Sequence, residues 1–220
     1  MIELKKILIV FNFLFFSIIF SYVLEYDVFT DGATSTMIWN IEKLNERVVY
    51  ESKLDEISQK YIYFDDILQE WIYEDSLKLK KIVAVRKGDY VDLKIFEKDV
   101  LIKTESLNLP KNAMWFQNPD FFLIKYFKEY DDNFKFFLIN PDDLKINIFN
   151  VEYLGEEELD IHGKSFLTDK FKASVNIFLG ISFNTYYWYR SSDSRFLKFK
   201  TEAFLLFSES LTTISKKYIY

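Results

Sequence analysis

The sequence predicts a mainly β protein, built as a curved antiparallel sheet or meander that forms an open half-barrel or a sandwich-like arrangement. One short helix is expected to pack on this sheet. Three observations support this fold class: apolar and polar residues alternate along several stretches, short turn signals separate those stretches, and only one segment begins like a helix.

Alternation with a period of two marks the predicted strands. One face of such a strand is buried and the other is in water, as in an antiparallel sheet with one wet face. The apolar positions are Tyr26, Val28 and Thr30; Val91, Leu93 and Ile95; Phe171, Ala173, Val175 and Ile177; and Leu197, Phe199 and Thr201. Each set is interleaved with charged or polar residues, so each stretch is expected to bury one face and expose the other.

Turn-forming residues separate the strands at short intervals, which is typical of hairpins in a meander. They are Asp31-Gly32, Lys87-Gly88-Asp89, Glu97-Lys98-Asp99, Asp131-Asp132-Asn133, His162-Gly163-Lys164 and Ser191-Ser192-Asp193-Ser194.

A helix is predicted to begin at Asn118. An asparagine cap, a proline at the first helical position and an acidic residue near the positive end of the helix dipole precede the apolar segment Phe121–Lys128. The segment Asn140–Asp143 repeats this start signal, but strand period returns at Ile146–Ile148, so only a turn is expected there.

The N-terminal residues predict export. Lys5 and Lys6 precede an apolar run from Ile7 to Phe20, in the order of a secretory signal. Cleavage after Ser21 is one outcome; the other is that Ile7–Leu24 stays as a membrane anchor with the lysines on the cytoplasmic side. Residues 1–24 are thus a signal peptide or anchor, and 25–220 form a single β-rich domain outside the cytoplasm, in the periplasm or cell envelope.

Composition excludes several classes of function. The chain has no cysteine, which removes disulfides, zinc–thiolate sites, thiol nucleophiles and a cysteine-linked lipid anchor. A net charge of −6 without a basic cluster argues against a nucleic-acid partner. Aromatic residues make up 20% of the chain, enough to fill a sheet-built core.

No catalytic residue, metal site or cofactor is predicted. His162 is the only histidine and lies in a turn signal, so it cannot build a histidine metal site and is unsuited to a catalytic triad. Carboxylate pairs remain, because two carboxylates alone can hydrolyse a glycosidic bond. They are Asp65-Asp66, Asp131-Asp132, Asp142-Asp143 and Glu156-Glu157-Glu158, and most of them lie at predicted turns.

Aromatic residues give the one positive indication of function. Trp71, Trp115 and Trp188 are the candidate ligand-binding residues, because flat rings on the concave face of a curved sheet hold an acyl chain or a similar apolar molecule. Ordinary core packing is the competing interpretation for all three.

Several short motifs resemble a family of exported bacterial proteins known only as a domain of unknown function. They are the strand Tyr26-Asp-Val-Phe-Thr-Asp-Gly32, the segment Glu70-Trp71-Ile-Tyr73, the stretch Pro110–Pro119 and the Trp188-Tyr189 strand that leads to Arg195. This chain departs from the family at Ala33–Thr36, where a further glycine is usual. The resemblance implies an exported, curved antiparallel β-fold and brings no catalytic residues.

The function hypotheses therefore belong to different classes. One is a non-enzymatic envelope module that binds an apolar small molecule or a partner protein, with membrane contact only through the N-terminal segment. The alternatives are an exported hydrolase that uses a carboxylate pair and a structural or interaction protein of the envelope. An outer-membrane barrel fits less well, given the Asn118 helix start and the polar stretch Ser208–Lys217.

Overall fold

The computed structural model describes residues 20–30, 33–111, 113–130, 133–178, 181–201 and 212–215. The predicted turn at Asp31-Gly32, residues Asp131-Asp132 and most of the predicted signal or anchor lie outside these ranges. Phe20–Leu24, which the sequence assigned to the N-terminal segment, form the start of a strand. Export and cleavage stay predictions.

One curved sheet contains every strand of the described residues, which confirms the predicted fold class. The first half of the chain is a meander of antiparallel hairpins. Its strands are β1 (Phe20–Thr30), β2 (Ala33–Leu44), β3 (Arg47–Leu54), β4 (Ile57–Phe64), β5 (Ile67–Asp75), β6 (Lys80–Lys87), β7 (Tyr90–Glu97) and β8 (Val100–Asn108).

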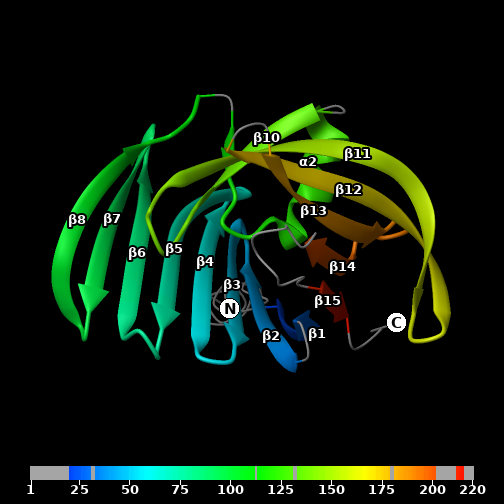
Figure 1. Ribbon diagram of the computed structural model, residues 1–220, viewed down its shortest axis with the longest axis horizontal. Coiled ribbons are helices and arrows are strands. Elements are labelled where there is room, and N and C mark those ends of the chain that lie inside the picture. Colours follow the sequence, from blue (N-terminus) through cyan, green and yellow to red (C-terminus); the bar gives the residue numbers. More distant parts are fainter. Residues whose placement is uncertain are drawn as a thin grey trace, which may run out of the picture.

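The second half continues the same sheet on the other side of β1. Its strands are β9 (Met114–Trp115), β10 (Asn133–Ile139), β11 (Ile146–Ile161), β12 (Lys164–Phe178), β13 (Ile181–Arg190), β14 (Phe196–Thr201) and β15 (Thr212–Ser215). The spatial order is β8-β7-β6-β5-β4-β3-β2-β1-β15-β14-β13-β12-β11-β10-β9, so the last strand lies beside the first. All pairs are antiparallel except β9 with β10. The end strands β8 and β9 do not pair with each other, and the sheet stays open (Figure 1).

The hairpin turns follow from residues that tolerate positive φ. Asn45, Asp55, Asp65 and Lys98 have φ of 53°, 50°, 47° and 47° at turns of the first half. Two-residue turns of this kind match the right-handed twist of the strands they join. The predicted turn at His162 is confirmed: its φ is 51°, and Gly163 follows at 76°.

The predicted helix begins where the capping signal placed it. The Asn118 side-chain oxygen accepts a hydrogen bond of 3.0 Å from the Asp120 backbone N–H, and Pro119 occupies the first turn. A short 3-10 helix, η1 (Pro119–Phe121), leads into α2 (Leu123–Tyr130). The second candidate start, at Asn140, is a turn as predicted, with the Asn140 side chain accepting from Asp142 N–H at 2.9 Å.

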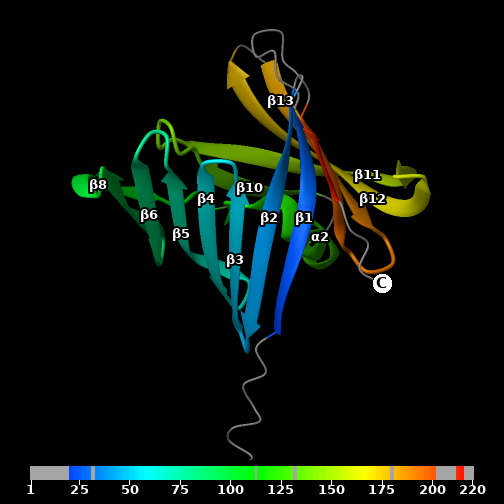
Figure 2. The ribbon, with the colours of Figure 1, turned by 90° about the horizontal axis from the view of Figure 1, so that it is seen from below.

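Helices η1 and α2 lie inside the curve of the sheet (Figures 1 and 2). Phe122 stacks on Tyr63 with ring centroids 4.2 Å apart, while Phe121 meets the edge of Trp39 at 5.1 Å. Phe127 meets Phe171 of β12 at 5.0 Å. The helical segment therefore fills the concave side and joins the two halves of the sheet through one aromatic core. No helix in the described part of the chain has the length and apolarity to cross a bilayer.

Candidate ligand-binding cleft

An open cleft of about 810 Å³ lies where the second half of the chain meets the turns of the first half. Its lining comes from the β4–β5 turn, the β6–β7 turn, the segment after β8, strands β9 and β10, and α2. This volume is within the range of pockets that hold small organic molecules. The cleft is accordingly the candidate functional site.

Apolar side chains make most of the walls. Trp115, Phe116 and Phe137 are buried behind the cleft, and Met114 is half-buried. Ile67 is 45% exposed at the mouth although it is a large apolar residue. Binding of an apolar ligand is favoured when the ligand covers solvent-exposed apolar surface in a concave site.

Gln117 fixes the position of Trp115. The Trp115 indole N–H donates to the Gln117 side-chain oxygen at 3.1 Å, and the Ile139 backbone N–H donates to the same oxygen at 3.0 Å. The Gln117 amide donates in turn to the Ile139 carbonyl at 2.6 Å. Strand β9 has only two residues, and beyond it the Gln117 side chain makes the hydrogen bonds to β10 that a longer strand would make with its backbone. Gln117 therefore holds Trp115 against β10.

Helix α2 is tied to the β4–β5 turn beside the cleft. The Tyr126 hydroxyl donates to the Asp66 carbonyl at 2.9 Å, and the Lys125 ammonium pairs with the Asp66 carboxylate. Asp66 itself has a φ of 61°, which the turn requires. These contacts set the distance between the helix and Ile67, which follows directly in β5.

Charged residues surround the apolar walls. Arg86, Lys111, Asp89 and Asp66 line the cleft. Asp66 is paired with Lys125, whereas Arg86 and Lys111 form no ion pair with any described residue. Two cations without a carboxylate partner thus stand beside an apolar surface, with Asp89 as the remaining acid.

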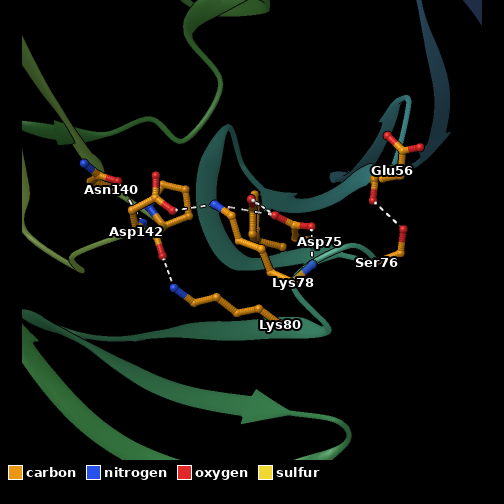
Figure 3. Close-up of polar contacts among 9 residues, drawn as sticks. Glu56, Asp75, Ser76, Lys78, Lys80, Asn140 and Asp142 are labelled. Carbon is orange, nitrogen blue, oxygen red and sulfur yellow. Dashed lines mark hydrogen bonds and ion pairs between the residues drawn. The ribbon is translucent and has the colours of Figure 1, made fainter.

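A second set of polar contacts holds the two halves together at the other end of β5. Figure 3 shows Lys78 between Asp75 and Asp142, with Lys80 beside it. The Lys78 ammonium lies 3.0 Å from an Asp142 oxygen and 3.7 Å from an Asp75 oxygen. The Lys78 backbone N–H also donates to Asp75 at 2.9 Å and is the main cause of the low pKa of that carboxyl.

Asp120 is an acid in the aromatic interior. Burial raises its pKa to about 7. Burial also raises the pKa of Tyr26, Tyr61 and Tyr187, and the Asp120 charge raises each of them further. No ion pair compensates this carboxylate among the described residues, so its ionisation opposes folding.

The three tryptophans predicted to line one groove do not share a surface. Trp71 is 0% exposed and its indole N–H donates to Gln59 at 3.1 Å, so it is a core residue. Trp115 alone lines the cleft. Trp188 is outside the core cluster and lies on the opposite face of β13 from Tyr187 and Tyr189, because successive strand residues alternate.

On that outer face, Trp188 is covered by charges. Its indole N–H donates to Glu157, and the ammonium groups of Lys170 and Lys198 lie 5.1 and 5.0 Å from the ring centroid. Burial opposes ionisation of Glu157, but the Trp188 and Lys170 contacts hold the pKa of Glu157 below its usual value. Trp188 is 6% exposed, so these contacts leave little of its ring accessible to a ligand.

Of the carboxylate groups named from the sequence, Asp65-Asp66 and Asp142-Asp143 lie at turns, whereas Glu156-Glu157-Glu158 lie within β11. Asp65 and Asp66 form the β4–β5 turn, and Asp143 pairs with Lys145 at 3.0 Å. His162 occupies its predicted hairpin turn. Within the described residues, no three histidine, aspartate or glutamate side chains are grouped so as to hold a metal ion.

The sequence missed most of the cleft. Arg86, Ile67 and Lys111 carry no motif, and they come together only because the sheet curls back on itself. One sequence feature could have pointed to the cleft. Ile67 is an apolar residue directly after the Asp65-Asp66 turn, at a position on the exposed face where a charged residue would be expected.

The fold and the cleft define a class of protein: an open, β-barrel-like sheet with a helical segment inside its curve. Among solved structures, the chain is similar to the crystal structure of a β-barrel-like protein of domain of unknown function DUF1849 from Brucella abortus. The TM-score is 0.52 at 11% sequence identity, with 90% of this chain and 96% of that chain covered. This likeness shows the fold alone. No family model matches the chain, and no curated protein does.

Proposed function

We propose that the protein is a non-enzymatic binding module that holds an apolar small molecule in the cleft beside Trp115. The single observation that supports this function is an 810 Å³ cleft whose apolar walls include Ile67, a large aliphatic residue left 45% exposed. Trp71 and Trp188 are not part of this proposal, since neither lines the cleft.

The charges at the cleft specify the ligand further. Arg86 and Lys111 supply positive charge next to apolar walls, a combination suited to an acyl chain or ring system that ends in a carboxylate. The apolar portion would cover Ile67 and Met114, and the anionic end would pair with the two cations. Asp89 disfavours ligands with several negative charges.

Titration with a brominated fatty acid, read through tryptophan quenching, tests the proposal. We expect saturable quenching that Trp115→Phe largely removes, because Trp115 lines the cleft and Trp71 does not. Ile67→Glu should weaken binding at least about tenfold by placing a charge against the chain. Leu77→Glu is the matched control, since Leu77 is 77% exposed in the turn after β5 and does not line the cleft.

A second comparison isolates the role of the cations. Arg86→Gln combined with Lys111→Gln should weaken binding of the fatty acid about tenfold and leave binding of the corresponding fatty alcohol unchanged. An equal loss for both ligands would show that these residues do not bind the carboxylate. Absence of saturable binding to the folded wild-type protein would refute the proposed function as a whole.

We also propose that the protein works outside the cytoplasm, in the periplasm or cell envelope. Lys5 and Lys6 followed by the apolar run Ile7–Phe20 support this localisation. Fractionation of cells that express the full chain tests it: the protein should be found outside the cytoplasm. A soluble cytoplasmic product with its N-terminus intact would contradict export without bearing on the cleft.

A further inference from the structure

Strand β8 is one end of the sheet and carries an exposed apolar stretch. It pairs with β7 on one side and with no described strand on the other (Figure 1). Val100, Leu101 and Ile102 are 63%, 49% and 51% exposed. An edge of this length with consecutive exposed apolar residues is a template for pairing with another strand.

The charged residues of β8 indicate which strand fits. Lys103 and Glu105 flank Thr104, the middle residue of Val100–Asn108, and they form an ion pair of 2.6 Å within the strand. They lie opposite Ile95 and Leu93 of β7 and so share one face of the sheet. A single lysine on an edge discourages pairing, but a lysine and a glutamate placed symmetrically about a midpoint suit a partner with the reversed order of charges.

We propose that two copies of this chain associate through their β8 strands, antiparallel, about a two-fold axis at Thr104. In this register Lys103 of each copy lies directly opposite Glu105 of the other, and the β-bulge at Ile102 lies outside this central ladder. Cross-strand neighbours in an antiparallel pair have Cβ atoms about 5 Å apart, close enough for both ion pairs to form between the copies. The sheet then continues from one copy into the other, and the exposed stretch Val100–Ile102 is covered.

Charge reversal tests the proposal on the full chain in a mild detergent, with the mass of the protein measured by light scattering. The wild-type protein should be a dimer. Lys103→Glu and Glu105→Lys should each weaken self-association at least about tenfold, because each places like charges opposite one another twice per dimer. An equimolar mixture of the two variants should restore the dimer, since every opposed pair is then complementary. Both variants keep residues 1–19, so association through that segment would persist in each of them.

A cysteine scan tests the register. The natural chain has no cysteine, so any disulfide-linked dimer must form at an introduced residue. Thr104→Cys should cross-link to itself on mild oxidation, and Ser106→Cys should not, because only a residue on the two-fold axis meets its own copy. A monomeric wild-type protein, full self-association of either charge variant, or equal cross-linking at both positions would overturn the proposal. Binding at the cleft is measured separately and does not depend on this outcome.

Discussion

Replacing Asp120 with asparagine is expected to stabilise the fold at neutral pH and to have little effect in acid. The carboxyl lies in the aromatic interior, and burial raises its pKa from 3.8 to about 7. The folded protein therefore binds a proton at this site more tightly than the unfolded chain does. The unfolded chain ionises Asp120 freely above pH 4, so wild-type stability falls as the pH rises from about 4 to about 7.

The size of the effect follows from the pKa difference. A rise in pKa of about 3 lowers the free energy of unfolding by about 4 kcal/mol at pH values above 7, at about 1.4 kcal/mol for each pKa unit. Asp120 keeps partial solvent exposure although protein surrounds it, so we expect about 2 kcal/mol. Asparagine retains the shape and avoids the charge. The Asp120 backbone N–H, which donates to Asn118, is unchanged by the substitution.

Urea unfolding of the wild type and Asp120→Asn between pH 4 and pH 8 measures this difference. The variant's gain in unfolding free energy should be near zero at pH 4 and grow to about 2 kcal/mol by pH 8. Carboxyls with lowered pKa values, such as Asp75, affect both proteins equally and cancel. Asp143→Asn is the control with the opposite sign, because Lys145 lowers the pKa of Asp143. A gain that does not vary with pH, or a loss at pH 8, would refute the reasoning.

Three further substitutions test the fold. Phe122→Ala should cost about 3–5 kcal/mol of unfolding free energy in urea titrations, because Phe122 is buried and stacks on Tyr63. Lys78→Met should leave the free energy of unfolding nearly unchanged in the same assay, since its ion pair with Asp142 is exposed; a clear loss would mean that this contact contributes more to stability than an exposed ion pair does. His162→Gly should leave thermal stability and fatty-acid binding unchanged, because glycine adopts the positive φ of 51° readily.

The sequence predicted those parts of the fold that depend on local chemistry. Alternation identified β1, β7, β12 and β14 because each has one face on the core. The helix start at Asn118 was correct because capping is a contact between residues two or three positions apart. A curved sheet was also predicted, with an open half-barrel as one of two arrangements, and the sheet of the described residues is open and curved.

Features that depend on distant parts of the chain were not predictable. The return of β15 to the side of β1 reflects contacts between opposite ends of the sequence, such as Tyr26 with Ser215. Trp71 and Trp115 look alike as sequence signals and are both buried, yet only Trp115 lies at the cleft. Bulges add to the difficulty: one at Trp188 and Tyr189 shifts the register with β14, so that Phe196 and Leu197 are both buried despite being adjacent.

The cleft exists because the two ends of the sheet approach without pairing. Strand β9 has only two residues, and Pro110 in the segment before it cannot donate a backbone hydrogen bond. The two halves of the chain are joined instead by side chains of other elements, with Tyr126 of α2 bonded to Asp66 in the β4–β5 turn and Lys78 after β5 paired with Asp142 after β10. A closed ladder would have brought β8 against β9 and left no room beside Trp115. Side-chain contacts leave the cleft beside Trp115 open on this side, which is where the proposed binding module needs its opening.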